Sequence, residues 1–197
     1  MILFFCCCFC GYSQKYSFAS VSKYEKRWAI FHPFAAIKIK KHKNEMLAIY
    51  NEVRDQKVLD AFENGGQLDA FRHTFSMAYL SKFVSTKKLR KLGKAHEKGN
   101  YLQYLRDESE DGELPDSLSS VMDLKNNDVG LSLKNEVKKL SIQETKSFVV
   151  GVVKNGWAII IKRNSDGLYV DCNGNIISRA PMYKRWSWPK CLVASNK

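Results

Sequence analysis

Residues 65–83, GGQLDAFRHTFSMAYLSKF, mix charged side chains into the apolar positions of one expected helix. An amphipathic helix normally keeps charge away from its apolar stripe, so this pattern limits how the segment can pack. Asp69 and His73 are four residues apart and therefore share one face of the helix, with Arg72 beside them. The fold must either satisfy these groups in its interior or line a site with them.

Two later stretches carry polar groups in the same way. KLGKAHEKGNY, residues 91–101, contributes His96 and Glu97, while SSVMDLKNNDVG, residues 119–130, contributes Asp123, Asn126, Asn127 and Gly130. A glycine inside a helix costs about 1 kcal/mol relative to alanine, so Gly130 indicates a close backbone contact or a nearby ligand. Three helices could therefore direct histidine, carboxylate and amide groups into one space, as bundle cores do.

The hydrophobic periodicity predicts a mainly α fold, a bundle-like helical body with a small C-terminal antiparallel β-meander. We expect a helix over residues 67–84, and a basic helix N-capped by Thr86 that stops near Gly99 and Asn100. Another helix is expected from Ser120 towards Leu140, and a capping box at Ser141 opens a helix that Asn155 and Gly156 end. WAIIIKR, LYVD and IIS read as the strands of the meander.

The N-terminus, MILFFCCCFCGYSQ, reads as an export signal, because its apolar run is too short to span a bilayer as a helix. We expect a signal peptide at residues 1–13, cleaved between Ser13 and Gln14, although no basic residue precedes Lys15. The expected organisation is then a helical domain over residues 14–155 and a meander with an aromatic, basic tail over residues 156–197, without a transmembrane span in the mature chain. The protein would be exported to the periplasm, the cell envelope or the medium.

Signal cleavage leaves two cysteines, Cys172 and Cys191, in the mature chain. In an exported protein such a pair most simply forms one disulfide, which would stabilise the fold by roughly 3 kcal/mol. Two unpaired buried thiols are the alternative.

The formal net charge is +12, and residues 82–98 hold seven lysine and arginine residues against one acid. Such an excess favours an anionic ligand or an anionic envelope surface. The sequence contains no nucleic-acid-binding motif, so the charge does not choose among anionic partners.

The motifs DAFRH, AHEKGN and MDLKNNDVG, in this order and spacing, resemble an uncharacterised bacterial domain family of unknown function. Its members are found in exported and toxin-like bacterial proteins, and the resemblance extends over residues 28–140. It marks nine positions here: Asp69, Arg72, His73, His96, Glu97, Asp123, Asn126, Asn127 and Gly130. An aromatic residue that often follows the motif histidine is represented only by Phe75. The resemblance implies export but no established activity.

Three hypotheses follow for these residues. In the first, the chain is a metal-assisted hydrolase: Asp69, His73, His96 and Asp123 ligate a divalent ion, most simply zinc, and Glu97 acts as general base. In the second, catalysis needs no metal: His73 or His96 transfers protons, Glu97 orients one of them, and Arg72 holds an anionic group of the substrate. Asn127 is a further candidate catalytic residue. In the third, the polar groups form a structural network in a non-enzymatic cell-envelope binding or scaffolding module.

Overall fold

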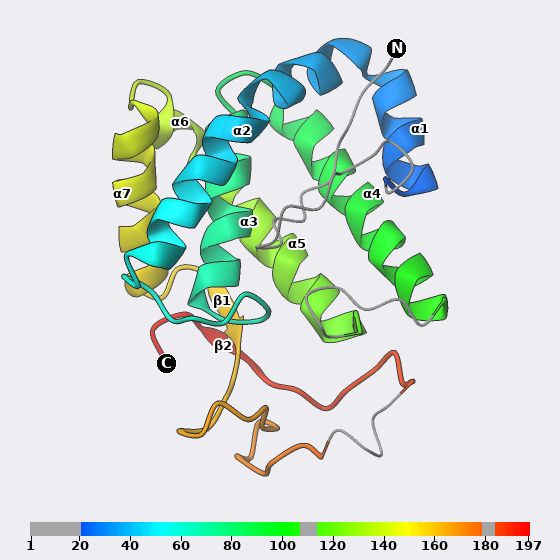
Figure 1. Ribbon diagram of the computed structural model, residues 1–197, viewed down its shortest axis with the longest axis vertical. Helices are drawn as coiled ribbons and strands as arrows, with labels where there is room; N and C mark the ends of the chain where they lie inside the picture. The colour runs from blue at the N-terminus through cyan, green and yellow to red at the C-terminus, as the bar shows by residue number, and fades with distance from the viewer. Residues whose placement is uncertain (1–20, 107–113, 179–183) are drawn as a thin grey trace.

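The computed structural model describes residues 21–106, 114–178 and 184–197. The described part contains seven helices and two short strands, which confirms the predicted mainly α fold (Figure 1). The expected signal peptide and its cleavage site lie outside the described residues. The helices are α1 Lys23–Phe31, α2 Pro33–Asp55, α3 Gln67–Leu80, α4 Thr86–Leu105, α5 Ser117–Ser132, α6 Lys134–Val137 and α7 Ile142–Lys154, and the strands are β1 Ile159–Ile161 and β2 Leu192–Ala194.

Helix α3 lies at the centre of the helical body, in contact with α2, α5, α6, α7 and β1 (Figure 1). Every residue from Leu68 to Leu80 is buried. A helix enclosed on all sides has no solvent-facing stripe on which to place polar side chains, so Asp69, Arg72 and His73 are buried with the rest. The start of α3 is capped by Asp60, whose carboxylate accepts hydrogen bonds from the backbone N–H groups of Gln67 and Leu68.

Helices α3 and α5 pack closely because Gly130 has no side chain. A Cβ atom at this position would lie 2.2 Å from the backbone oxygen of Thr74 and 3.0 Å from the Cβ of Met77. The glycine predicted to mark a close contact therefore makes one with the backbone of α3. This approach brings Asp123, two turns earlier on α5, against Asp69 and His73.

The C-terminal segment joins the body through β1. Strand β1 pairs with β2 in antiparallel register, Ile160 opposite Val193, and residues 163–176 add only isolated bridges between Arg163 and Tyr169 and between Val170 and Ile176. The predicted meander is thus reduced to single bridges, and the paired strand comes from the C-terminal tail. A disulfide joins Cys172 to Cys191 immediately before β2, with Cα atoms 4.8 Å apart. A disulfide is compatible with an exported protein.

Several helix ends differ from the sequence prediction. Helix α3 ends at Leu80 instead of continuing to residue 84, and Ser85 rather than Thr86 occupies the N-cap position of α4. Helix α4 does not stop at Gly99 and Asn100 but continues to Leu105. Gly99 instead permits close packing of α1, because a Cβ there would lie 2.8 Å from the Cβ of Ser22.

Helix α5 begins at Ser117, not at Ser120, because Asp116 is its N-cap and accepts hydrogen bonds from the backbone N–H groups of Leu118 and Ser119. The helix expected to reach Leu140 breaks at Leu133, between α5 and α6. The capping box at Ser141 and Glu144 and the end of α7 at Asn155 are as predicted. Among the described residues, no helix is long and apolar enough to cross a membrane.

Candidate metal centre

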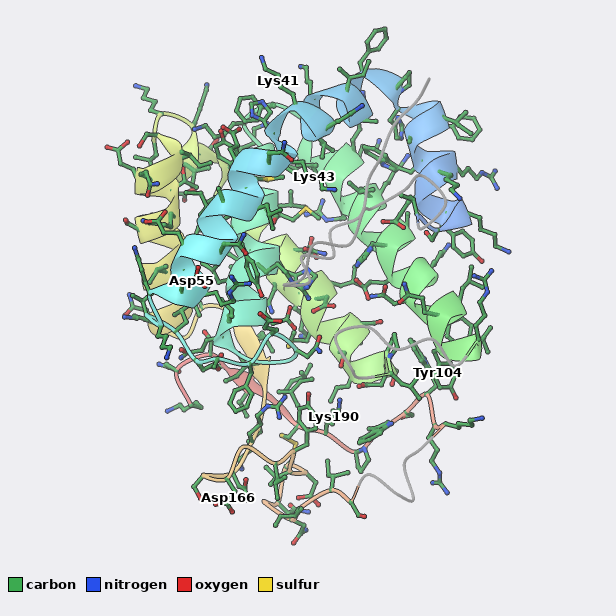
Figure 2. All side chains as sticks on the ribbon, viewed as in Figure 1. Lys41, Lys43, Asp55, Tyr104, Asp166 and Lys190 are labelled. Carbon is green, nitrogen blue, oxygen red and sulfur yellow. A yellow bond between two sulfur atoms is a disulfide. The ribbon has the colours of Figure 1, made fainter. Side chains whose placement is uncertain are left out.

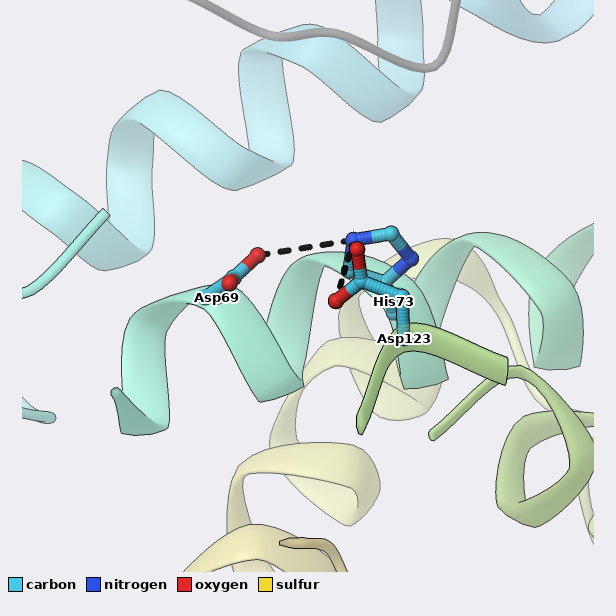
Figure 3. A group of neighbouring side chains, drawn as sticks. All are labelled: Asp69, His73 and Asp123. Carbon is cyan, nitrogen blue, oxygen red and sulfur yellow. Dashed lines mark ion pairs between the residues drawn. The ribbon is translucent and has the colours of Figure 1, made fainter. Parts of the chain in front are cut away.

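Three buried side chains from two helices meet between α3 and α5. Asp69 and His73 come from α3 and Asp123 comes from α5 (Figure 3). The Nε2 atom of His73 lies 3.3 Å from Oδ1 of Asp123 and 3.4 Å from Oδ1 of Asp69. One ligand atom from each of the three residues lies within 4.8 Å of the others, so this group could hold a metal ion. The predicted candidates Asp69, His73 and Asp123 are thus brought together.

Asp69 is fixed by strong local hydrogen bonds. Its Oδ1 atom accepts hydrogen bonds from Nε and Nη2 of Arg72, at 3.1 and 2.7 Å, and its Oδ2 atom accepts one from the backbone N–H of Gly65 at 2.7 Å. Gly65 can supply this N–H because it adopts a φ of +73°, which places the preceding loop over the start of α3. Arg72 therefore orients Asp69 in the described structure.

His73 is oriented from its other ring nitrogen. Its Nδ1 atom lies 3.3 Å from Oδ1 of Asn127, which can accept the ring N–H. This hydrogen bond leaves the lone pair of the neutral ring on Nε2, the atom that faces the two carboxylates. Asn127 is thus placed to set the tautomer of His73.

Burial and neighbouring charges shift the pKa values of all three residues. Burial raises the pKa of the Asp69 carboxyl, but Arg72 and His73 outweigh burial and hold that pKa well below its usual range. Burial raises the pKa of Asp123 well above its usual range, and the charges of Asp69 and Glu97 add to the effect against the opposing charge of His73. Burial lowers the pKa of His73, but Asp123 and Asp69 raise it overall. His73 and Asp123 therefore hold a proton tightly.

His96 and Glu97 lie in the middle of α4 and make different contacts. Nδ1 of His96 lies 3.2 Å from Oε1 of Glu25 on α1, and both side chains are buried. Oε2 of Glu97 accepts a hydrogen bond from the side-chain amide of Asn100 at 3.1 Å. Among the described residues, the group that could hold a metal comprises Asp69, His73 and Asp123, and His96 is not part of it.

Two small cavities adjoin the centre, and His96 and Arg72 line both. One, of about 40 Å³, is also lined by Asp69, Asn100 and Asp123. The other, of about 10 Å³, is lined by Glu25, His73 and Asn127. A cavity needs roughly 10–15 Å³ to hold a water molecule, so the larger one has room for an ion with a few waters. His96 therefore borders the same cavity as the two aspartates, while its partner Glu25 lines only the smaller cavity.

The remaining marked residue, Asn126, has a structural role. Its side-chain amide donates to the backbone oxygen of Ile159 and accepts from the backbone N–H of the same residue, each at 2.8 Å. This double hydrogen bond joins α5 to the start of β1, as a strand partner would. Asn126 thus attaches the C-terminal segment to the helix that carries Asp123.

Glu25 is the site residue that sequence reasoning missed. It is only 3% exposed, and its pairing with His96 spans 71 positions of the chain. Burial raises its pKa, but hydrogen bonds with His96 and Ser22 outweigh burial and lower the pKa overall. The one sequence signal is SKYE at residues 22–25, a capping box in which Glu25 accepts from the backbone N–H of Ser22. That signal predicts the helix start but not the contact with His96.

A family model described as a domain of unknown function (DUF6973) matches residues 26–157, which include all the residues of this centre except Glu25. Neither the curated proteins nor the solved structures contain a significant match to the chain.

Proposed function

The chain belongs to this family of unknown function, and we propose that it is a metal-assisted hydrolase with its divalent ion bound between α3 and α5. The ligands are Asp69, His73 and Asp123, and His96 serves as proton acceptor. His96, which the sequence also offers as a ligand, takes this role because the atoms that lie close enough to share an ion belong to Asp69, His73 and Asp123.

The main support for this proposal is the distance between Nε2 of His73 and Oδ1 of Asp123. Nε2 of His73 and Oδ1 of Asp123 are buried and have no hydrogen-bond partner among the described residues. Their separation of 3.3 Å is longer than the about 2.7–2.9 Å of a charge-assisted hydrogen bond. It matches the separation of about 3.3 Å between two ligands of a tetrahedral zinc ion with bonds of about 2.0–2.1 Å. The distance from Nε2 to Oδ1 of Asp69, 3.4 Å, is close to the same value.

The charge balance supports a cation at this position. Asp69 and Arg72 neutralise one another, which leaves Asp123 and His73 to share a proton. A divalent ion would replace that proton and relieve the raised pKa of Asp123. One imidazole with two carboxylates suits zinc, manganese or iron better than magnesium or calcium, which prefer oxygen ligands alone.

A bound divalent ion would lower the pKa of a coordinated water towards neutrality. In this proposal the chain supplies the acceptor for that proton. His96 is directed by Glu25 through Nδ1, as a carboxylate directs a catalytic histidine, and it borders the cavity shared with Asp69 and Asp123. Glu97 is the general base expected from the sequence, but it is hydrogen-bonded to Asn100. Its effect on the site is electrostatic, because its charge helps to raise the pKa of Asp123.

The alternative is a non-enzymatic cell-envelope binding or scaffolding module in which the polar groups form a structural network. The hydrogen bonds of Asp69 favour it, because Arg72 and Gly65 already satisfy both carboxylate oxygens. A buried network of this kind can specify helix packing without catalysing a reaction. In either case we propose that the chain is exported, with residues 1–13 as its signal peptide, which the disulfide between Cys172 and Cys191 supports.

The test of function is hydrolysis of chromogenic phosphoesters, carboxyl esters, glycosides and peptides by the chain loaded with zinc, manganese or iron. We expect turnover of one class that disappears in Asp123→Asn together with the metal. In His96→Gln, turnover should fall at least a hundredfold while the metal stays bound. Metal binding without turnover of any class, or turnover unchanged in both variants, would contradict the proposed activity.

A further inference from the structure

The corner between α1 and α2 exposes four large apolar side chains. Ile30 is 69% exposed, Phe31 66%, Phe34 79% and Ile37 54%. They lie within eight consecutive residues, at the end of α1 and the start of α2. Phe34 and Ile37 are three residues apart and share a face of α2, which continues one turn further to Lys41. We call these four residues the apolar corner.

The chain around the apolar corner is strongly basic. Residues 21–44 contain a single acid, Glu25, which is buried against His96 and cannot neutralise the surface. The same stretch contains seven cations, and Lys41 points away from the body in Figure 2. These cations are Lys23, Lys26, Arg27, Lys38, Lys40, Lys41 and Lys43.

A basic groove lies beside the apolar corner, between α1 and α4. It has a volume of about 650 Å³ and is lined by aromatic residues of α1 and by cations of both helices. Its three lysines, Lys91, Lys94 and Lys98, are exposed and follow one another at helical spacing along α4. Arg27 connects the groove to the apolar corner, because its guanidinium lies 5.7 Å from the ring centroid of Phe31.

We propose that the apolar corner and the basic groove form a docking surface for an anionic phospholipid membrane. Exposed aromatic and aliphatic side chains flanked by lysines are the composition of interfacial membrane-binding segments. Ile30, Phe31, Phe34 and Ile37 enter the boundary between headgroups and acyl chains, while the surrounding cations pair with lipid phosphates. The groove has the size and charge to accept a headgroup.

The aliphatic side chains distinguish a lipid surface from a nucleic acid. Ile30 and Ile37 have no flat face on which a base can stack, and stacking is what aromatic residues contribute to single-strand binding. Burying them against acyl chains removes apolar surface from water. The proposal is independent of the metal centre, because Asp69, His73 and Asp123 play no part in it.

The experiment measures co-sedimentation of the full chain with vesicles of phosphatidylcholine, alone or mixed with phosphatidylglycerol. We expect binding to the anionic vesicles, at least tenfold weaker binding to neutral ones, and a decrease as salt is raised. The double variant Phe31→Ser/Phe34→Ser should lose at least tenfold in affinity. Trp157→Ser, at a residue that is 67% exposed and lies between α7 and β1, should bind as the unmodified chain does.

The charge contribution is tested with two matched triple variants. Lys40→Gln/Lys41→Gln/Lys94→Gln should lose at least tenfold, whereas Lys138→Gln/Lys139→Gln/Lys154→Gln, with the same change in net charge, should lose less than threefold. All substituted positions are exposed, so circular dichroism and melting temperature should not change.

Equal binding by the apolar-corner variant and the unmodified chain would overturn the proposal, because another part of the chain, such as residues 1–20, would then bind the membrane. Failure of the chain to bind anionic vesicles would also overturn the proposal. If the chain instead binds a single-stranded oligonucleotide, and both the apolar-corner variant and the Lys40/Lys41/Lys94 variant lose that binding, the surface is a nucleic-acid surface.

Discussion

His73 and Asp123 face each other across the α3–α5 contact with their Nε2 and Oδ1 atoms 3.3 Å apart. Oδ1 of Asp123 has no hydrogen-bond partner among the described residues. The carboxylate of Asp69, one turn before His73, instead accepts three hydrogen bonds from Arg72 and Gly65. The two aspartates of this centre therefore differ in how well their carboxylates are hydrogen-bonded. The difference leads to separate predictions for their removal.

In the metal-free chain, Asp69→Asn should lower the free energy of unfolding by about 2–4 kcal/mol, because it leaves the buried guanidinium of Arg72 without its ion pair. Asp123→Asn should change it by less than about 1 kcal/mol, because the substitution removes a carboxyl whose ionisation burial already opposes. Urea titrations in the presence of a chelator measure both. Equal destabilisation by the two variants would show that Asp123 belongs to the structural network.

Gly130→Ala should destabilise the fold by about 1–3 kcal/mol, because its Cβ would lie 2.2 Å from the backbone oxygen of Thr74 and force α3 and α5 apart. Gly151→Ala is the matched control. Gly151 is also inside a helix, α7, and a Cβ there meets nothing within 4 Å, so alanine should stabilise the chain by about 0.5–1 kcal/mol. Thermal unfolding measures both variants: the melting temperature should fall for Gly130→Ala and rise for Gly151→Ala. A Gly130→Ala variant that is more stable than the unmodified chain would refute the close contact.

Glu25→Gln should reveal a pH-dependent contribution to stability. The pKa of Glu25 is lowered in the fold from its ordinary value of 4.5, so its ionised form stabilises the native chain above that pH. This contribution is lost as the pH falls through the native pKa. Unfolding free energies should therefore differ by about 1–3 kcal/mol between the variant and the unmodified chain at pH 6, and should converge as the pH falls below 4.5 and through the native pKa. A difference that stays constant with pH would mean that Glu25 acts through packing alone.

The disulfide should contribute roughly 3 kcal/mol, because it closes a loop between residues 19 positions apart. Cys172→Ser/Cys191→Ser should show this loss in urea titrations. Peptide mapping of the unreduced chain provides the control, since it should recover the peptides of Cys172 and Cys191 as one linked species. Recovery of the two peptides separately would contradict the pairing.

The sequence predicts those parts of the fold that local signals determine. Helical spacing on α3 places Asp69 and His73 on one face, and the Ser141 capping box fixes the start of α7. The sequence also predicts that Asp123 shares one space with the α3 pair. Gly130 indicates the close helix packing that makes this contact possible.

Contacts between distant segments account for what the sequence does not predict. Glu25 pairs with His96 across 71 positions, and no local pattern connects the two. Gly99 resembles a helix stop, but α4 continues through it because Ser22 of the α1 N-cap packs on that glycine. Strand β2 forms opposite β1 because the tail returns to the body, where Ser195 donates a hydrogen bond to the backbone oxygen of Val153. In each case tertiary packing overrides local propensity.

The central claim is that a divalent ion binds between α3 and α5, and metal analysis of the purified chain tests it most directly. Zinc, manganese or iron should be present, or taken up on titration, at one ion per chain, and should be absent from His73→Gln and Asp123→Asn. Asp128→Asn is the control, because Asp128 lies on the same helix as Asp123 but is exposed and pairs with Arg90. That variant should bind the ion as the unmodified chain does. A chain that neither contains nor takes up metal, or one whose metal survives both site substitutions, would contradict the assignment.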